Sequence, residues 1–148
     1  MNGLEQIARE NEPLADYTWF GIGGEARFFF EPRNRDELKD VARRCRENDI
    51  AMRVLGSGSN ILVPDSGVDG AVIRLSGDFE EVTFVEDGVE AGAAFKMSNL
   101  VLRTIREGRS GLEGLTGVPG SIGGCVRINA GGAFGEPQHL RILLRDGL

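Results

Sequence analysis

Apolar residues recur at helical spacing in two stretches of the chain. The first stretch predicts an amphipathic helix over about residues 35–48, with Asn34 or Asp36 as its N-cap, and its apolar positions are Leu38, Val41, Ala42 and Cys45. The second repeats the pattern from Met97 to Ile105 and is followed by Gly108, where a glycine commonly ends a helix.

Short runs of β-branched and aromatic residues predict strands between and after these helices. The runs cover residues 26–30, 52–55, 61–63, 71–75, 82–85 and 89–91. Glu86-Asp87-Gly88 is typical of a tight turn, so the last two strands are expected to form a hairpin. Strands and helices do not alternate regularly, which favours an α+β fold over a doubly wound sheet.

Composition and charge exclude several classes of protein. The net charge of −6 is unfavourable for binding nucleic acid or an anionic membrane, and no apolar run is long enough to span a bilayer. The N-terminus lacks the order of a signal peptide, so we expect a cytoplasmic protein with Cys45 and Cys125 reduced. One histidine and two cysteines are too few for a zinc site built from these residues, and no metal site is predicted.

Glycine-rich segments are the candidates for ligand binding, since the chain has 22 glycines in 148 residues. Residues 21–26 match G-x-G-x-x-A, but a strand-like run follows them where a dinucleotide fingerprint requires a helix. We therefore interpret residues 21–26 as a turn that enters a strand. No Gly-Lys-Ser/Thr sequence is present, which excludes a Walker loop.

The segment Gly56-Ser57-Gly58-Ser59-Asn60 is a stronger candidate. It directly follows a predicted strand, and its small residues allow backbone amides to converge on an anion. A polar loop without a ligand is an equally good interpretation of its composition. Residues 114–124 are chemically similar, and Asn129-Ala130-Gly131 follows them, so two such loops favour a dinucleotide held through its phosphates.

Four motifs in this order resemble one known family. They are residues 17–24 (YTWFGIGG), 54–63 (VLGSGSNILV), 111–124 (GLEGLTGVPGSIGG) and 128–131 (INAG). Together they resemble the UDP-N-acetylenolpyruvoylglucosamine reductases, the flavoenzymes of peptidoglycan precursor synthesis, from about Pro13 to Glu136. The second motif alone would indicate only the wider family of vanillyl-alcohol-oxidase-like FAD domains.

The resemblance implies a two-lobed α+β FAD-binding domain of the vanillyl-alcohol-oxidase (PCMH) type, truncated before a substrate domain. It implies noncovalent FAD between the lobes, NADPH as electron donor and a UDP-sugar, the enolpyruvyl ether of UDP-GlcNAc, as hydride acceptor. The expected lobes are residues 1–77 and 78–136, followed by an atypical tail at 137–148. The residues expected to bind FAD are Gly56, Ser57, Gly58, Ser59, Asn60, Ile61, Pro119, Gly120, Ser121, Gly123, Gly124, Asn129, Ala130 and Gly131.

The family's reduction machinery has no counterpart in this sequence. The Tyr-Arg pair of the family motif is absent, because the only tyrosine, Tyr17, precedes Thr18. We therefore assign no catalytic residue to this chain. A separately encoded C-terminal substrate domain is one partner that we expect for it. Two alternatives remain open: a flavin-binding module or gene fragment without reductase activity, and the FAD domain of another oxidase of the wider family.

Overall fold

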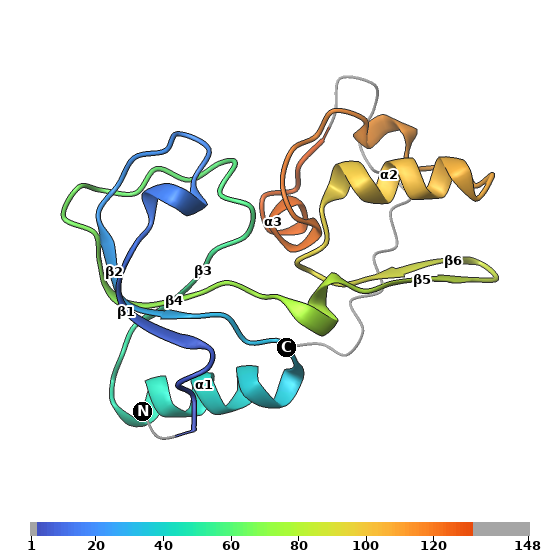
Figure 1. Cartoon of the computed structure of the whole chain (residues 1–148). Helices are drawn as coiled ribbons and strands as arrows, with labels where there is room; N and C mark the ends of the chain where they lie inside the picture. The colour runs from blue at the N-terminus through green and yellow to red at the C-terminus, as the bar shows by residue number, and fades with distance from the viewer. Residues whose placement is uncertain (1–2, 132–148) are drawn as a thin grey trace. The chain divides into compact units, whose positions relative to one another are not determined.

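A computed structural model describes residues 3–131, and the predicted tail at 137–148 lies outside them. The chain divides into two compact units, Met1–Asp78 (unit 1) and Phe79–Leu148 (unit 2) (Figure 1). Each unit combines helices and strands without regular alternation, which confirms the predicted α+β class.

A four-stranded sheet forms the centre of unit 1 (Figure 1). Its order is β1 (Ala8–Pro13), β2 (Glu25–Phe30), β4 (Val68–Ile73) and β3 (Met52–Val54). β1 is antiparallel to β2, whereas β2, β4 and β3 are parallel neighbours. The sheet supplies Phe29 and Val72 to a buried cluster that also holds Leu14, Leu55 and Val63.

The strands of unit 1 differ from the predicted ones in two places, one strand that was not predicted and one predicted strand that does not form. β1 was not foreseen, because its sequence is mostly charged and polar, which suits an exposed edge strand. Residues 61–63 form no strand, although they are apolar, and instead belong to the irregular connection between β3 and β4. Val63 is buried without a ladder partner, so its burial in the core explains its apolar character.

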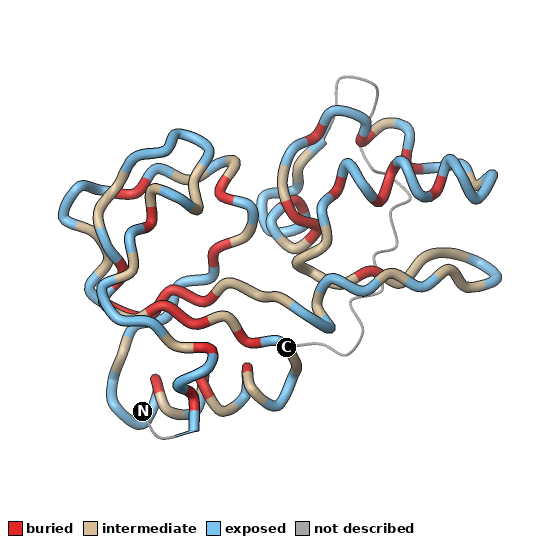
Figure 2. Tube along the Cα trace, viewed as in Figure 1, coloured by how far each residue is buried: buried red, intermediate tan, exposed pale blue. Residues whose placement is uncertain are grey.

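Helix α1 (Arg35–Glu47) confirms the first predicted helix. Asn34 is its N-cap, and its side-chain oxygen accepts a hydrogen bond of 3.0 Å from the backbone N–H of Glu37. Leu38, Val41 and Cys45 form its buried face, and buried positions recur along the helix in Figure 2.

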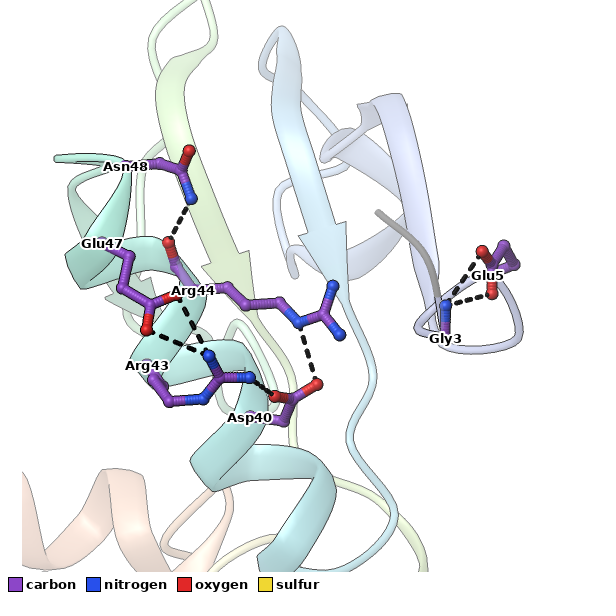
Figure 3. A network of polar contacts seen from close by, with 7 residues as sticks. All are labelled: Gly3, Glu5, Asp40, Arg43, Arg44, Glu47 and Asn48. Carbon is purple, nitrogen blue, oxygen red and sulfur yellow. Dashed lines mark hydrogen bonds and ion pairs between the residues drawn. The ribbon is translucent and has the colours of Figure 1, made fainter.

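The exposed face of α1 is covered by ion pairs between its own residues (Figure 3). Asp40 pairs with Arg43 and, at 2.9 Å, with Arg44, while Arg43 also reaches Glu47 at 3.0 Å. The carboxyl pKa of Asp40 is lowered by its hydrogen bond from Arg43 and by the two nearby positive charges. These arginines therefore form a solvated face with its own counter-charges, and they are poor candidates for an anion site.

Unit 2 is built on a hairpin and two helices. β5 (Val82–Val85) and β6 (Gly88–Ala91) pair antiparallel across a two-residue turn, which confirms the predicted hairpin. Helices α2 (Met97–Arg106) and α3 (Ile122–Arg127) follow. Their buried side chains share one cluster that includes Met97, Leu100, Leu115, Ile122 and Cys125.

Within residues 3–131, α1, α2 and α3 end in the same backbone motif. The residue after each C-cap has a left-handed backbone, with φ of +54° at Asp49, +66° at Gly108 and +49° at Asn129. In each case this residue and the next donate hydrogen bonds back to the last turn, as in Asn129 N–H to Val126 and Ala130 N–H to Cys125. The prediction of Gly108 as a helix-ending glycine is confirmed.

We expect Asn34→Ala to lower the free energy of unfolding by about 1 kcal/mol, because the amide at the start of α1 loses its acceptor. Urea denaturation followed by circular dichroism measures the change. Lys39→Gln, an exposed substitution in the same helix, is the control and should change stability by less than about 0.5 kcal/mol. Equal effects of the two substitutions would contradict the capping role.

Candidate functional site

The loop of residues 56–60 begins where β3 ends. Leu55 still belongs to the sheet, since its N–H donates to the carbonyl of Ile73 at 2.9 Å. Gly58 then has φ of +66°, whereas neither Ser57 nor Ser59 has a positive φ. A left-handed residue between neighbours of negative φ changes the direction of the backbone, and such a change can turn successive N–H groups toward one concave anion site.

Gly58 is enclosed by the segment that follows the short 3-10 helix Ala15–Tyr17. A Cβ at position 58 would lie 2.0 Å from the carbonyl oxygen of Tyr17 and 2.8 Å from the Cα of Thr18. On the other side of the peptide, the Gly58 carbonyl accepts a 3.0 Å hydrogen bond from the N–H of Trp19. Position 58 therefore requires glycine for packing within unit 1, in addition to any requirement of a ligand.

The backbone amides of this loop have no hydrogen-bond partner among the residues that the structure describes. No N–H from Gly56 through Ile61 donates a hydrogen bond to another residue among those described, 3–131. Gly58 is nevertheless buried, and buried backbone donors are nearly always paired with protein, water or a ligand. A row of unpaired donors on a fixed loop fits a multivalent anion such as a pyrophosphate.

The side chains of the loop would neither repel a bound anion by charge nor all be buried away from it. Ser57 and Asn60 are exposed, Ser59 and Ile61 are half-buried, and Ile61 packs against the core of unit 1. Residues 56–64 include no Asp or Glu, so no carboxylate of the loop itself would repel a phosphate. The hydroxyls of Ser57 and Ser59 are available as additional donors.

The second predicted segment, Pro119–Gly124, differs from this loop in its hydrogen bonding. The amides of Ile122 and Gly123 donate to the carbonyls of Phe95 at 2.9 Å and Ala93 at 2.8 Å, and the Gly124 amide donates to the Ser121 hydroxyl at 3.4 Å. The first two donors attach the start of α3 to residues 93–95, and the third is used by the helix cap. The sequence similarity of the two segments therefore does not extend to the amides of residues 122–124, which are paired within unit 2.

Several of the predicted residues in unit 2 have clear structural roles. Ser121 is buried and caps α3, and a Cβ at Gly123 would lie 3.0 Å from that of Ala93. Asn129 is exposed and ends α3 with its left-handed backbone, while Ala130 packs against the core of unit 2. These roles explain the residue types locally, and contact of Pro119–Gly124 or of Asn129–Gly131 with a ligand stays a prediction.

Three large apolar side chains in the segments that adjoin the loop of residues 56–60 are exposed. Trp19, Phe20 and Leu62 are 69%, 65% and 71% exposed. Trp19 and Phe20 thus lie outside the core, whereas Phe29 and Phe30 are buried in it. In the sequence, the glycines at 21, 23 and 24 are the signal for this exposure, because they indicate irregular backbone where apolar side chains can remain exposed.

Comparison with known proteins identifies the domain family. The signature of the FAD binding domain family matches residues 26–147, a range that contains every predicted site residue. The chain belongs to the FAD-binding domain family. This FAD-binding domain lacks a helix that could cross a membrane within residues 3–131.

Among the curated relatives of this FAD-binding domain are UDP-N-acetylenolpyruvoylglucosamine reductases. UDP-N-acetylenolpyruvoylglucosamine reductase of Rhodopirellula baltica is 44% identical over 124 residues, which cover 83% of this chain and 41% of the relative. The reductase of Lactobacillus helveticus is 37% identical over 143 residues, which cover 94% of this chain and 48% of the relative. The chain therefore spans less than half the length of these relatives.

Solved structures agree on the fold. A UDP-N-acetylenolpyruvylglucosamine reductase from Thermus caldophilus matches with a TM-score of 0.73 and 44% identity, over 88% of this chain and 46% of that one. A solvent-stable cholesterol oxidase matches 88% of this chain and 26% of its own with a TM-score of 0.55 and 17% identity, a likeness of fold alone. The predicted resemblance to the reductase family and the predicted FAD-domain fold are both confirmed.

Proposed function

We propose that this chain binds FAD noncovalently and that residues 56–61 hold its pyrophosphate. The observation that carries the proposal is the row of unpaired amides that includes the one at buried Gly58. The positive φ of Gly58 and the absence of acidic residues from 56–64 support an anion at this place. Membership of the FAD-binding family supports FAD as the source of that anion.

We further propose that the chain is the FAD-binding part of a cytoplasmic UDP-N-acetylenolpyruvoylglucosamine reductase in peptidoglycan synthesis. The names and the 35–45% identity of its relatives support this assignment. In the complete enzyme, NADPH would be the reductant and a UDP-sugar the acceptor. Residues 1–77 and 78–136 would form the two lobes of the FAD domain, and a C-terminal substrate domain would supply the remaining groups.

The contribution of this chain would be binding and orientation. Bound FAD would supply the hydride chemistry. The loop amides would neutralise the pyrophosphate charge, and each charge-assisted hydrogen bond is worth about 1.5–3 kcal/mol. We assign no proton transfer to this chain. Cys125 is buried, and burial raises the pKa of its thiol, so we assign it no role as a thiolate base.

Replacing Ser57 with proline tests the proposed phosphate site, because it deletes one unpaired N–H and follows the permissive Gly56. We expect Ser57→Pro to weaken FAD binding at least about tenfold, as for the loss of one charge-assisted hydrogen bond. Ser57→Ala is the matched control, since it keeps the amide and removes only the hydroxyl. Quenching of flavin fluorescence on titration measures both affinities. A folded Ser57→Pro protein that binds FAD as tightly as Ser57→Ala would exclude this amide from the site.

We propose that Pro119, Gly120, Ser121, Gly123, Gly124, Asn129, Ala130 and Gly131 also contact FAD, and Asn129 offers the clearest test. Asn129→Gly keeps the left-handed end of α3 and removes the amide side chain, whereas Asn129→Ala loses both. If the side chain binds FAD, both variants should weaken binding by about fivefold to tenfold. If Asn129→Gly binds FAD like the unaltered chain, Asn129 only caps the helix.

A further inference from the structure

The hydroxyl of Tyr17 lies inside a polar network on one side of the sheet in unit 1. It donates to the Glu12 carboxylate, Oη to Oε1 2.5 Å, and accepts from Arg9 Nη1 at 2.8 Å. Arg9 also pairs with Glu12 at 3.0 Å and contacts Glu31. Glu31 in turn accepts from Arg74 Nη1 at 2.8 Å. Two arginines and two carboxylates therefore balance their charges around one phenol.

The ring of Tyr17 also has close contacts on the protein. It stacks on the fully buried ring of Phe29 with 4.6 Å between the ring centroids, and the Arg74 guanidinium carbon lies over the tyrosine ring, 5.3 Å from the centroid of that ring. Partial burial and the hydrogen bond to Glu12 raise the pKa of Tyr17, so it keeps its proton at neutral pH and continues to donate. Side-chain freedom at this residue is largely removed before any ligand arrives.

The backbone of Tyr17 packs against the loop of residues 56–60 at Gly58. The Tyr17 carbonyl oxygen lies where a Cβ at position 58 would have to fit, and two residues later the Trp19 N–H binds the Gly58 carbonyl at 3.0 Å. Segment 17–19 is thus fixed by a side chain at its beginning and attached to the loop at its end. Loss of the side-chain anchor would loosen the attachment of Gly58, on which the direction of the neighbouring amides depends.

We propose that Tyr17 is a positioning residue for FAD: its side-chain network holds residues 17–19 against Gly58 and thereby keeps the amides of residues 56–61 directed at the pyrophosphate. The inference rests on the proposed FAD function. Its physical basis is that a loop fixed in advance avoids the entropic cost of ordering when the ligand binds.

The experiment compares Tyr17→Phe with the unaltered chain in two ways. Phenylalanine keeps the ring on Phe29 and removes only the hydroxyl. In the FAD-free chain, we expect the Trp19 amide, whose acceptor is Gly58, to exchange its hydrogen about tenfold faster in NMR measurements, as for the weakening of one hydrogen-bonded attachment. In titrations, we expect the FAD dissociation constant to rise by about fivefold to tenfold.

Arg27→Gln is the control. It breaks an exposed ion pair in the same sheet, between Arg27 Nη1 and Asp69 Oδ1 at 3.2 Å, and neither residue belongs to the loop. It should leave both readouts unchanged. If Tyr17→Phe does not fold, Glu12→Gln removes the charge that the hydroxyl meets while keeping an acceptor, and a smaller change in the same directions is expected.

The outcomes separate this inference from the proposed function. Unchanged Trp19 exchange, or faster exchange with unchanged FAD affinity, would overturn the positioning role. Failure of the unaltered chain to bind FAD would refute the proposed function and with it the part of the inference that concerns FAD. Exchange at Trp19 would still decide whether Tyr17 holds the loop.

Discussion

The 148-residue chain alone is expected to leave UDP-N-acetylenolpyruvoylglucosamine unreduced, even when FAD is bound and has been reduced. Proton delivery contributes about 10²–10⁴-fold to such reactions, and one oxyanion donor contributes about 10²–10³-fold. Neither role has a candidate residue in this sequence. The rate should therefore fall at least about 10⁴-fold below that of a complete reductase, taking the lower limit of each contribution.

The assay is reduction of the FAD-loaded chain without oxygen, followed by addition of the enolpyruvyl substrate. A complete reductase such as that of Thermus caldophilus serves as the positive control. Flavin absorbance should remain that of the reduced form, and no UDP-N-acetylmuramate should appear. Stoichiometric reoxidation with product formation would show that the catalytic groups lie within this chain.

Substitution of Gly58 is expected to have the largest effect on the fold and on FAD binding together. Gly58→Ala would place a methyl group 2.0 Å from the Tyr17 carbonyl oxygen at a φ of +66°. We expect a loss of about 3 kcal/mol or more in the free energy of unfolding, from overlap added to left-handed strain. FAD affinity of the folded fraction should fall at least about a hundredfold, because several loop amides move away from the phosphates.

Gly108→Ala separates strain from overlap. Gly108 has the same φ of +66°, but a Cβ there would meet nothing within 4 Å. This control should cost only about 1–2 kcal/mol and leave FAD affinity unchanged. Urea denaturation and flavin titration provide the two measurements. Similar losses of stability and affinity in both variants would show that contact with Tyr17 does not restrict position 58.

The elements that the sequence predicted well are those specified by local residues. The apolar face and Asn34 cap of α1, the left-handed Gly108 after α2 and the Glu86-Asp87 turn each require only neighbours along the chain. β1 was missed because its stability depends on pairing with β2, and its own side chains are mostly charged or polar. Residues 61–63 were wrongly predicted as a strand, because Val63 is apolar. Its side chain is buried in the core, but its backbone pairs with no strand.

The candidate site was predictable in composition and not in hydrogen bonding. Small residues at 56–60 and 119–124 have the same chemistry in sequence. Only the fold shows that the amides of Ile122 and Gly123 are occupied by carbonyls of residues 93–95, whereas those of 56–61 have no partner among residues 3–131. The role proposed for Tyr17 was equally hidden, because its partners come from three strands, β1, β2 and β4, and their immediate ends.

The most direct test of the account compares the binding of FAD and of riboflavin to the purified 148-residue chain by calorimetry. The two ligands share the isoalloxazine ring and differ in the pyrophosphate and adenosine. ADP, which has a diphosphate without the flavin, identifies the contribution of that half. We expect FAD to bind at least about a hundredfold more tightly than riboflavin, since two or more charge-assisted hydrogen bonds belong to the phosphates. ADP should bind measurably in the unaltered chain and lose affinity in Ser57→Pro. Equal affinities for FAD and riboflavin, or no binding of FAD at all, would contradict the assignment of residues 56–61 as the pyrophosphate site.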